Sequence, residues 1–240
     1  MGAATAVRTV RDMTEPRTAL VTGASRGLGL ALARALADDG WNLVLDARQP
    51  GPLREVEVEL AQRTTVRAIA GDVADERHRR ALADAVEHLD ALVHNASDLG
   101  PSPLPALADL PLDALERIYA VNVFGPLRLT QLLLPKLRPG GRVVSITSDA
   151  AVEAYPGWGG YGSSKAALEQ WTAVLAVERP DLRIHRVDPG DMRTRMHQDA
   201  FPGEDISDRP PPERSVPGLV RLLVEDVPSG RHTTSGLVPA

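Results

Sequence analysis

The chain has 240 residues, of which 43% are apolar and 25% charged, and this composition fits a soluble globular protein rather than a disordered one. A formal net charge of −5 argues against a nucleic-acid partner, which would need a basic surface. The lack of cysteine excludes disulfides and thiolate chemistry, the six histidines lack metal-ligand spacing, and no apolar run approaches the roughly 18 residues of a membrane span. We therefore expect a cytoplasmic protein with no metal, no nucleic-acid partner and no membrane partner.

Residues 1–16 include Arg8, Arg11, Asp12 and Glu15 but lack the apolar core of a secretory signal. We interpret this stretch as a flexible N-terminal extension. No linker or repeat interrupts the pattern that follows, so we predict that residues 17–240 form a single domain.

Predicted strands and helices alternate from residue 17 onward. An apolar strand at 18–21 runs through a glycine-rich turn into a helix at 28–39, where Leu28, Leu32 and Leu36 recur every four residues. Further strands are predicted at 43–45, 66–70, 91–93, 142–147, 182–187 and, weakly, 236–238, and further helices at 53–62, 76–88, 112–137, 163–178 and 216–224. This alternation predicts an α/β fold, a doubly wound, Rossmann-like parallel sheet in three α/β/α layers.

Two segments depart from this rhythm. Pro126 and Pro135 fall inside the predicted helix at 112–137, which we expect to kink or break at either of them. Residues 195–214 are polar and include three successive prolines, so we predict a short loop there.

The turn after the first strand reads Thr22-Gly23-Ala24-Ser25-Arg26-Gly27-Leu28-Gly29. Because glycine has no Cβ, such a turn can bend tightly and let a pyrophosphate approach the backbone closely. The helix that follows offers free N–H groups and the positive end of its dipole to the phosphate. The turn therefore favours a dinucleotide site over a plain structural loop.

A second motif, Tyr161-Gly-Ser-Ser-Lys165, lies at the start of a predicted helix. Residues four apart share one helix face, so the Lys165 ammonium is expected to lie beside the Tyr161 phenol. A nearby positive charge favours the phenolate and should lower the pKa of the phenol from its ordinary value near 10. Tyr161 is thus a candidate for exchanging a proton with a substrate oxygen.

The spacing Gly23-x-x-x-Gly27-x-Gly29, with Ser148 thirteen residues before Tyr161 and Lys165 four after it, resembles the short-chain dehydrogenase/reductase family. The resemblance implies an NAD(P)(H)-dependent oxidoreductase that interconverts a carbonyl and an alcohol by hydride transfer. It makes Tyr161 the general acid or base, and Ser148 the group that holds the substrate oxygen. It also implies that Lys165 binds the nicotinamide ribose, and that Asn122 holds a water that carries protons from the lysine to solvent.

The same resemblance assigns the cofactor contacts. Asp72-Val73 resembles the adenine-binding pair, and Thr194 falls where the family's threonine binds the nicotinamide carboxamide. His94-Asn95-Ala96-Ser97 stands where the family commonly has Asn-Asn-Ala-Gly, and we interpret the departing His94 as a packed structural residue. The full expected set is Gly23, Ser25, Arg26, Gly27, Leu28, Gly29, Asp46, Arg48, Asp72, Val73, Asn95, Ala96, Tyr161, Lys165, Pro189, Gly190 and Thr194.

The signals that choose between the two cofactors conflict. Arg48 and Arg26 could hold a 2′-phosphate, which guanidinium groups suit well, and this favours NADP(H). Asp46 could instead accept hydrogen bonds from the adenosine ribose and repel that phosphate, which favours NAD(H). We favour NADP(H) over NAD(H).

Substrate, assembly and turnover are less constrained. Tyr155 and Trp158 either line a pocket or simply pack their loop, and the polar segment 195–214 predicts a small lid over an open site that does not suit a greasy ligand. The resemblance implies a small-molecule carbonyl or alcohol substrate and a homo-oligomer, a dimer or tetramer, formed through the helices at 112–137 and 163–178. Two alternatives stay open: a cofactor-binding regulatory or scaffolding protein without turnover, and an epimerase or dehydratase without net redox change.

Overall fold

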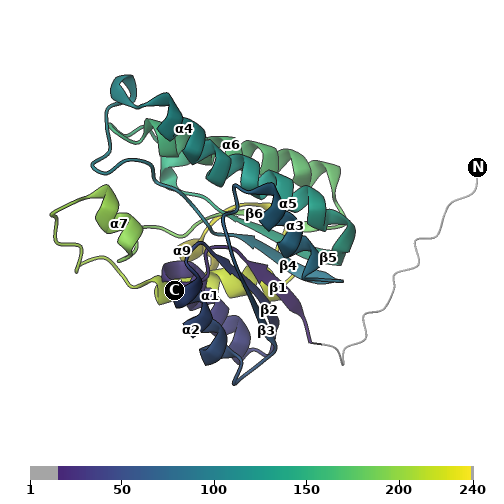
Figure 1. Ribbon diagram of the computed structural model, residues 1–240. Coiled ribbons are helices and arrows are strands. Elements are labelled where there is room, and N and C mark those ends of the chain that lie inside the picture. Colours follow the sequence, from purple (N-terminus) through teal and green to yellow (C-terminus); the bar gives the residue numbers. More distant parts are fainter. Residues whose placement is uncertain (1–15, 239–240) are drawn as a thin grey trace, which may run out of the picture.

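Seven parallel strands form one sheet in the order β3-β2-β1-β4-β5-β6-β7 (Figure 1). The computed structural model describes residues 16–238, so the predicted N-terminal extension lies almost wholly outside the described residues. The strands are β1 Thr18–Val21, β2 Asn42–Ala47, β3 Val66–Ala70, β4 Leu89–His94, β5 Leu137–Ile146, β6 Arg183–Asp188 and β7 Gly230–Thr233. The strand order reverses between β1 and β4, and ligands of doubly wound folds bind at the carboxyl ends of the strands beside this point.

Alternation along the strands divides the core between the two faces of the sheet. Ala19 and Val21 of β1 point to one face, where they join a buried cluster with helices α1 Gly27–Asp38, α2 Pro50–Leu60, α8 Val216–Val224 and α9 Thr234–Leu237. Leu20, between them, points to the other face and packs with residues of α3 Glu76–Asp84 and α5 Gly125–Leu133. Such strands, buried on both faces, confirm the predicted doubly wound, single-domain architecture.

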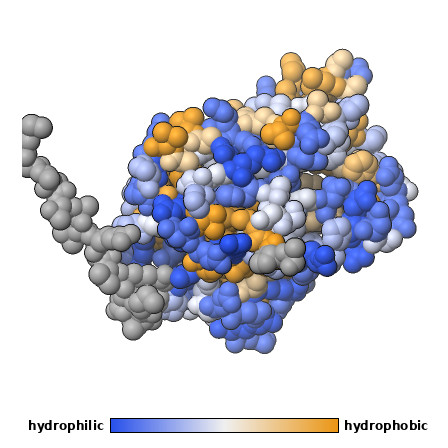
Figure 2. Space-filling view, turned by 180° about the vertical axis from the view of Figure 1, so that it is seen from behind, coloured by the Kyte–Doolittle hydropathy of each residue, from blue (hydrophilic) through white to orange (hydrophobic). Residues whose placement is uncertain are grey.

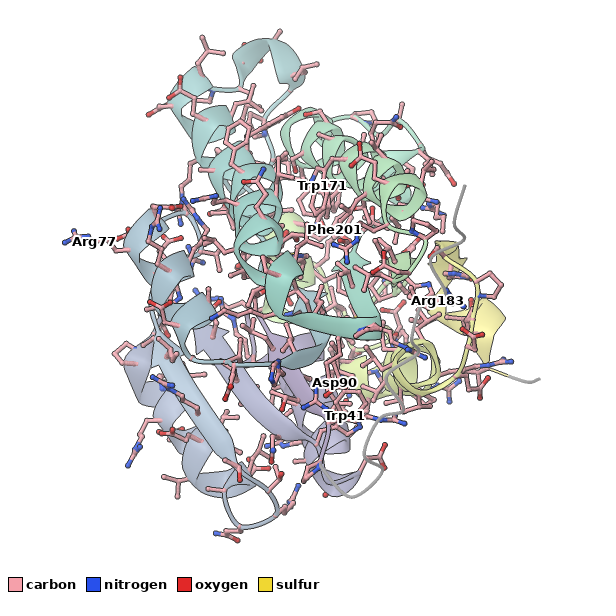
Figure 3. The ribbon with its side chains drawn as sticks, turned by 90° about the vertical axis from the view of Figure 1, so that its right-hand side faces the viewer. Trp41, Arg77, Asp90, Trp171, Arg183 and Phe201 are labelled. Carbon is pink, nitrogen blue, oxygen red and sulfur yellow. The ribbon has the colours of Figure 1, made fainter. Side chains whose placement is uncertain are left out.

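Helices α4 Leu112–Tyr119 and α6 Gly159–Glu178 cover the second face beside α5 (Figure 1). Arg77 of α3 faces outward (Figure 3), whereas Lys165 of α6 is buried. Among residues 16–238, no helix is long and apolar enough to cross a membrane.

The helix predicted at 112–137 forms over most of that range, as a series of helical segments. The chain forms α4, then a π-helical turn at Ala120–Phe124, then α5, and β5 already begins at Leu137. Pro126 lies in the first turn of α5, directly after the π-helical turn, and α5 ends at Leu133, so the predicted break falls at Pro135.

Two further corrections fall in the C-terminal third. The last strand is β7 at Gly230–Thr233, paired with β6, whereas the predicted strand at 236–238 overlaps α9. Residues 195–214 are not wholly a loop, because α7 Arg195–Ala200 forms there, capped by the Thr194 hydroxyl, which accepts a hydrogen bond from the His197 N–H. Figure 1 shows α7 standing apart from the three layers, on the side of the molecule where the strands end.

Candidate active site

A cavity of about 650 Å³ opens at the carboxyl ends of the strands. Of the residues expected to bind cofactor or substrate, thirteen line it: Gly23, Arg26, Gly27, Leu28, Arg48, Asn95, Ala96, Ser148, Tyr161, Lys165, Pro189, Gly190 and Thr194. The structure thus brings together segments that lie far apart in the sequence. Six expected residues do not line the cavity: Ser25, Gly29, Asp46, Asp72, Val73 and Asn122.

The glycine turn is held tightly against the loop that follows β4. Asn95 donates from Nδ2 to the carbonyls of Thr22 (2.9 Å) and Gly23 (3.1 Å), and the Thr22 hydroxyl accepts from the backbone N–H groups of Asn95 and Ala96. A Cβ on Gly29 would lie 2.4 Å from the Gly23 oxygen, and Gly23 has a positive φ of 66°. These two glycines are therefore required by close approach and by backbone conformation.

This turn suits the phosphates of a dinucleotide. Helix α1 begins at Gly27 behind the turn and has neither an acidic residue in its first turn nor a side-chain cap. Its first N–H groups are therefore free to bind an anion. Arg26 and Arg48 add positive charge to the same end of the cavity, although Arg48 also lies 3.7 Å from the carboxylate of Asp98.

Asp46 points away from the cavity, which contradicts the expected contact with the ribose. Its carboxylate is 1% exposed and lies 2.6 Å from Nε2 of His78, a residue of α3. Burial raises the pKa of Asp46, and the hydrogen bond to His78 opposes that shift. Strand alternation sends the Asp46 side chain under α3, so neither the ribose contact nor the repulsion of a 2′-phosphate expected of it is available.

The expected adenine pair lies beside the cavity rather than in its wall. Asp72 accepts a hydrogen bond from Arg117 of α4 at 2.6 Å, and Val73 is 5% exposed. The Val73 carbonyl accepts a hydrogen bond from Arg79. In this structure the two residues brace the end of β3 against neighbouring helices.

Ser148, Tyr161 and Lys165 meet at one wall of the cavity. Tyr161 lies in the first turn of α6, and the Lys165 ammonium, one turn later, lies 5.4 Å from the centre of its ring. The ammonium also donates to the Ile146 carbonyl at 2.9 Å, which ties α6 to the end of β5. Ser148 follows β5, and its hydroxyl donates to Asp149 at 2.8 Å.

Asn122 lies behind this wall, in the π-helical turn. Its side-chain amide donates to the Ser164 hydroxyl of α6 and to the Asp98 carbonyl, and its oxygen accepts from the Asp98 N–H and the Ser97 hydroxyl. Four hydrogen bonds use the whole capacity of this amide. The side chain therefore links the loop after β4 to α6 and has no capacity left to hold the expected water.

The electrostatics of the tyrosine differ from the expectation. Burial raises the pKa of the Tyr161 phenol, an interaction with the Ser97 hydroxyl lowers it, and the carboxylates of Asp149 and Asp188 raise it further. Burial also lowers the pKa of Lys165 to about 7. The predicted lowering of the phenol pKa by Lys165 is thus overturned by desolvation. At neutral pH the phenol is protonated and suited to donating a proton.

Arg231 of β7 was missed by the sequence analysis. Its guanidinium donates to Glu169 of α6 at 3.0 Å and to the Ser148 carbonyl at 3.2 Å, and it lies 3.7 Å from Asp188 at the end of β6. One side chain thus joins the serine segment, the tyrosine helix and β6. No sequence signal marks this arginine, because the contacts arise only from pairing β7 with β6.

Comparison with known proteins agrees with this geometry. Residues 17–205 match the family model described as short chain dehydrogenase. The chain is 35% identical over 186 residues to sulfoacetaldehyde reductase 2 of Chromohalobacter salexigens, covering 74% of this chain and 73% of that protein. A short-chain dehydrogenase structure from Salmonella enterica is 30% identical with a TM-score of 0.84, covering 92% of this chain and 96% of that one. A structure from Escherichia coli CFT073 complexed with NADPH is 29% identical with a TM-score of 0.83, covering 91% of this chain and 96% of that one. The chain therefore belongs to the short-chain dehydrogenase/reductase family and is an NAD(P)-dependent oxidoreductase.

Proposed function

We propose that this protein is an NADP(H)-dependent carbonyl reductase in which Tyr161 donates the proton to the substrate oxygen. The observation that carries the proposal is the shared cavity, which Ser148, Tyr161 and Lys165 line on one side and the glycine turn on the other. A protonated phenol, the form that burial favours, is the form that donates a proton to a carbonyl oxygen.

The side chains have distinct tasks in this proposal. When bound, the nicotinamide cofactor supplies the hydride. Ser148 orients the substrate oxygen, and Tyr161 gives it the proton. The phenolate that remains is stabilised by the ammonium of Lys165, 5.4 Å from the ring centre. With a pKa lowered to about 7, Lys165 can also return a proton to the phenol near neutral pH.

The preference for NADP(H) rests on Arg26 and Arg48. Both line the cavity, whereas the acidic residue that would oppose a 2′-phosphate, Asp46, is buried against His78. A related structure complexed with NADPH supports the same choice.

We expect NADPH turnover to exceed NADH turnover in the wild type, and Arg48→Ala to raise the KM for NADPH while changing the KM for NADH little. A wild-type preference for NADH would contradict this choice.

The test of the function is a screen of aldehydes, ketones and quinones, followed by loss of reduced-cofactor absorbance. We expect Tyr161→Phe to lower kcat at least about 100-fold, since a positioned proton donor contributes a factor of this size, while cofactor binding is retained. Near-normal turnover in that variant would refute the role of Tyr161. Cofactor binding without turnover of any carbonyl would favour a regulatory protein, and product formation without net cofactor consumption would favour an epimerase or dehydratase.

Assembly and location stay predictions. A homo-oligomer is supported by exposed apolar side chains on the second helical layer, where Phe124, Val174 and Val177 are 58%, 45% and 82% exposed. Figure 2 shows a further apolar gathering at the top of the molecule. Leu107 and Leu112 are exposed as well. The cytoplasmic location and the extent of the single domain beyond the described residues are not tested by the structure.

A further inference from the structure

An aromatic series runs from the candidate catalytic tyrosine to the helix over the cavity. The Trp158 ring lies 5.6 Å from the Tyr161 ring at an angle of 74°, and 6.0 Å from the Phe201 ring at 47°. Phe201, labelled in Figure 3, directly follows α7. Contacts of this kind are favourable ring arrangements, so they fix Trp158 between α6 and α7.

The residues around Trp158 are apolar. Leu99, Ala150, Tyr161 and Ala200 form a buried cluster, against which Leu104, Trp158, Met196 and Phe201 pack while partly buried. Of these, Leu99, Trp158, Tyr161 and Met196 also line the cavity. An apolar surface therefore adjoins the hydroxyls of Tyr161 and Ser148.

This arrangement settles the two alternatives for the aromatic residues before α6. Trp158 lines the cavity, whereas Tyr155 does not, is 40% exposed and donates its hydroxyl to Glu153 at 2.7 Å. The predicted polar lid segment also presents an apolar side chain, Met196, to the cavity beside polar ones such as Arg195 and His197. Helix α7 and the residue after it place Met196, Ala200 and Phe201 inward, while its charged pair Arg195 and Asp199 is largely exposed.

Two polar groups near this surface contact neighbouring residues, while others, such as Arg193 and His197, also line the cavity. The Asp149 carboxylate already accepts hydrogen bonds from the Ser148 hydroxyl and the Ala150 N–H. Arg195 lies 3.7 Å from Asp199. Beside the hydroxyls of Ser148 and Tyr161, the cavity wall presents the half-buried indole of Trp158 and the thioether of Met196, and such a surface binds a flat apolar group.

We infer that the site takes carbonyl compounds whose carbonyl carbon carries an aryl ring, with Trp158 and Met196 as the surface that binds the ring. The inference rests on the proposed reductase function. The carbonyl oxygen would reach Ser148 and Tyr161 while the ring lies along Trp158. Trp158 is then a specificity-determining residue, not one that takes part in proton transfer.

The experiment compares kcat/KM at saturating NADPH for two matched pairs, phenylglyoxal with methylglyoxal and benzaldehyde with acetaldehyde. We expect the wild type to favour the aryl member of each pair by at least about 10-fold. Trp158→Ala should lower the aryl values by about 10- to 100-fold, mainly through KM, and leave the small aldehydes within about threefold, since loss of an apolar contact costs a factor of this size. Trp158→Phe should keep most of the selectivity, and Tyr155→Ala, an aromatic three residues away outside the cavity, should keep all of it.

Equal wild-type turnover of aryl and small carbonyls, or an equal loss of both in Trp158→Ala, would overturn the inference and leave the reductase function standing. Absence of turnover with every carbonyl would instead sink the proposed function. The wild-type ratios of kcat/KM for aryl over small carbonyls test the inference even if Trp158→Ala is unstable. A fluorescence titration of cofactor affinity identifies a variant that has lost its fold.

Discussion

Ser97 connects the candidate proton donor to the rest of the site. Its hydroxyl donates to the side-chain oxygen of Asn122 at 3.2 Å, and its interaction with the Tyr161 phenol lowers the pKa of that phenol. A glycine, which the family commonly has here, provides neither contact. This residue therefore sets part of the proton affinity of Tyr161 in this chain.

Removing the Ser97 hydroxyl should raise the pKa of Tyr161 further. Oxidation of an alcohol needs the phenolate, so in Ser97→Ala the rise of kcat with pH should move to higher pH, and oxidation at pH 8 should slow several-fold. Reduction uses the protonated phenol and should change little at neutral pH. The pH dependence of kcat in both directions measures this. The control is Ser163→Ala, which removes an exposed hydroxyl from α6, the helix that carries Tyr161. Identical pH profiles for the wild type, Ser97→Ala and Ser163→Ala would contradict the role of Ser97.

Side-chain direction explains which site residues the sequence could predict. Tyr161 and Lys165 are fixed relative to each other by one helical turn, so their spacing predicts that they lie close together, whereas the place of Ser148 beside them was implied by the family resemblance. The predicted contact of Asp46 with the ribose failed, because the direction of a strand side chain decides whether it enters the cavity or the core. That direction follows from the packing of α3 on the sheet, which no local spacing records.

At the level of elements, β7 stabilises the catalytic wall through Arg231. The guanidinium joins the Glu169 carboxylate of α6 to the Ser148 carbonyl after β5. We expect Arg231→Gln to lower the free energy of unfolding by about 1–3 kcal/mol, a usual value for charged hydrogen bonds in a partly buried position, and to lower kcat several-fold by loosening Ser148. Arg231→Lys should recover little of the lost stability and kcat, because the lysine ammonium lacks the planar, forked donors of a guanidinium.

The control for Arg231 lies on the neighbouring strand. Arg183 of β6 pairs with Asp226, whose side chain is 76% exposed, and surface pairs of this kind contribute at most about 1 kcal/mol. Arg183→Gln should therefore leave both kcat and stability nearly unchanged. Urea unfolding and steady-state kinetics measure both quantities, and equal effects of the two substitutions would show that Arg231 is an ordinary surface residue.

Periodicity predicted the elements better than their ends. Strand β3 and helix α8 have the predicted bounds, since each is bordered by turn residues. Helix α7 was missed because its six residues are polar on one side and are held by a cap and by packing on Trp158, not by a long apolar repeat. Strand β7 was misplaced because Gly230–Thr233 has little strand character of its own and takes its conformation from pairing with β6.

On the scale of the whole molecule, buried histidines connect stability to pH. His94 is 3% exposed beneath the candidate active site and hydrogen-bonds Thr130 at 2.7 Å. Within residues 16–238, its Nδ1 has no hydrogen-bond partner. Burial, and then the charge of Lys165, lower the pKa of His94 to about 3. Burial in the sheet likewise lowers the pKa of His185 to about 3. Both histidines are therefore neutral in the folded protein and gain protons on unfolding below about pH 6.5.

A lowered histidine pKa gives stability that is complete above the unfolded value of about 6.5 and is lost as pH falls toward 3. Each of the two histidines should contribute a slope of up to about 1.4 kcal/mol per pH unit to the free energy of unfolding across this window. The raised pKa values of Asp46 and Asp188 act in the opposite sense at the acid end, where their protonation favours the folded state. The lowered pKa of Glu76, by contrast, adds to the loss at the acid end. The contribution of the histidines is therefore measured between about pH 5 and 6.5, above the pH at which carboxylates of the unfolded chain titrate.

Replacing His94 separates its share from the rest. His94→Asn keeps a polar group at the position but cannot be protonated. The pH slope of its free energy of unfolding between pH 5 and 6.5 should therefore fall by roughly 1 kcal/mol per pH unit relative to wild type, whatever its stability at pH 8. Urea unfolding at a series of pH values measures the slope. His88→Asn removes a histidine whose side chain is 59% exposed and should leave it unchanged. If His94→Asn and the wild type lose stability in parallel, then His94 takes up its proton without unfolding, and the acid sensitivity of the molecule has its origin in other groups.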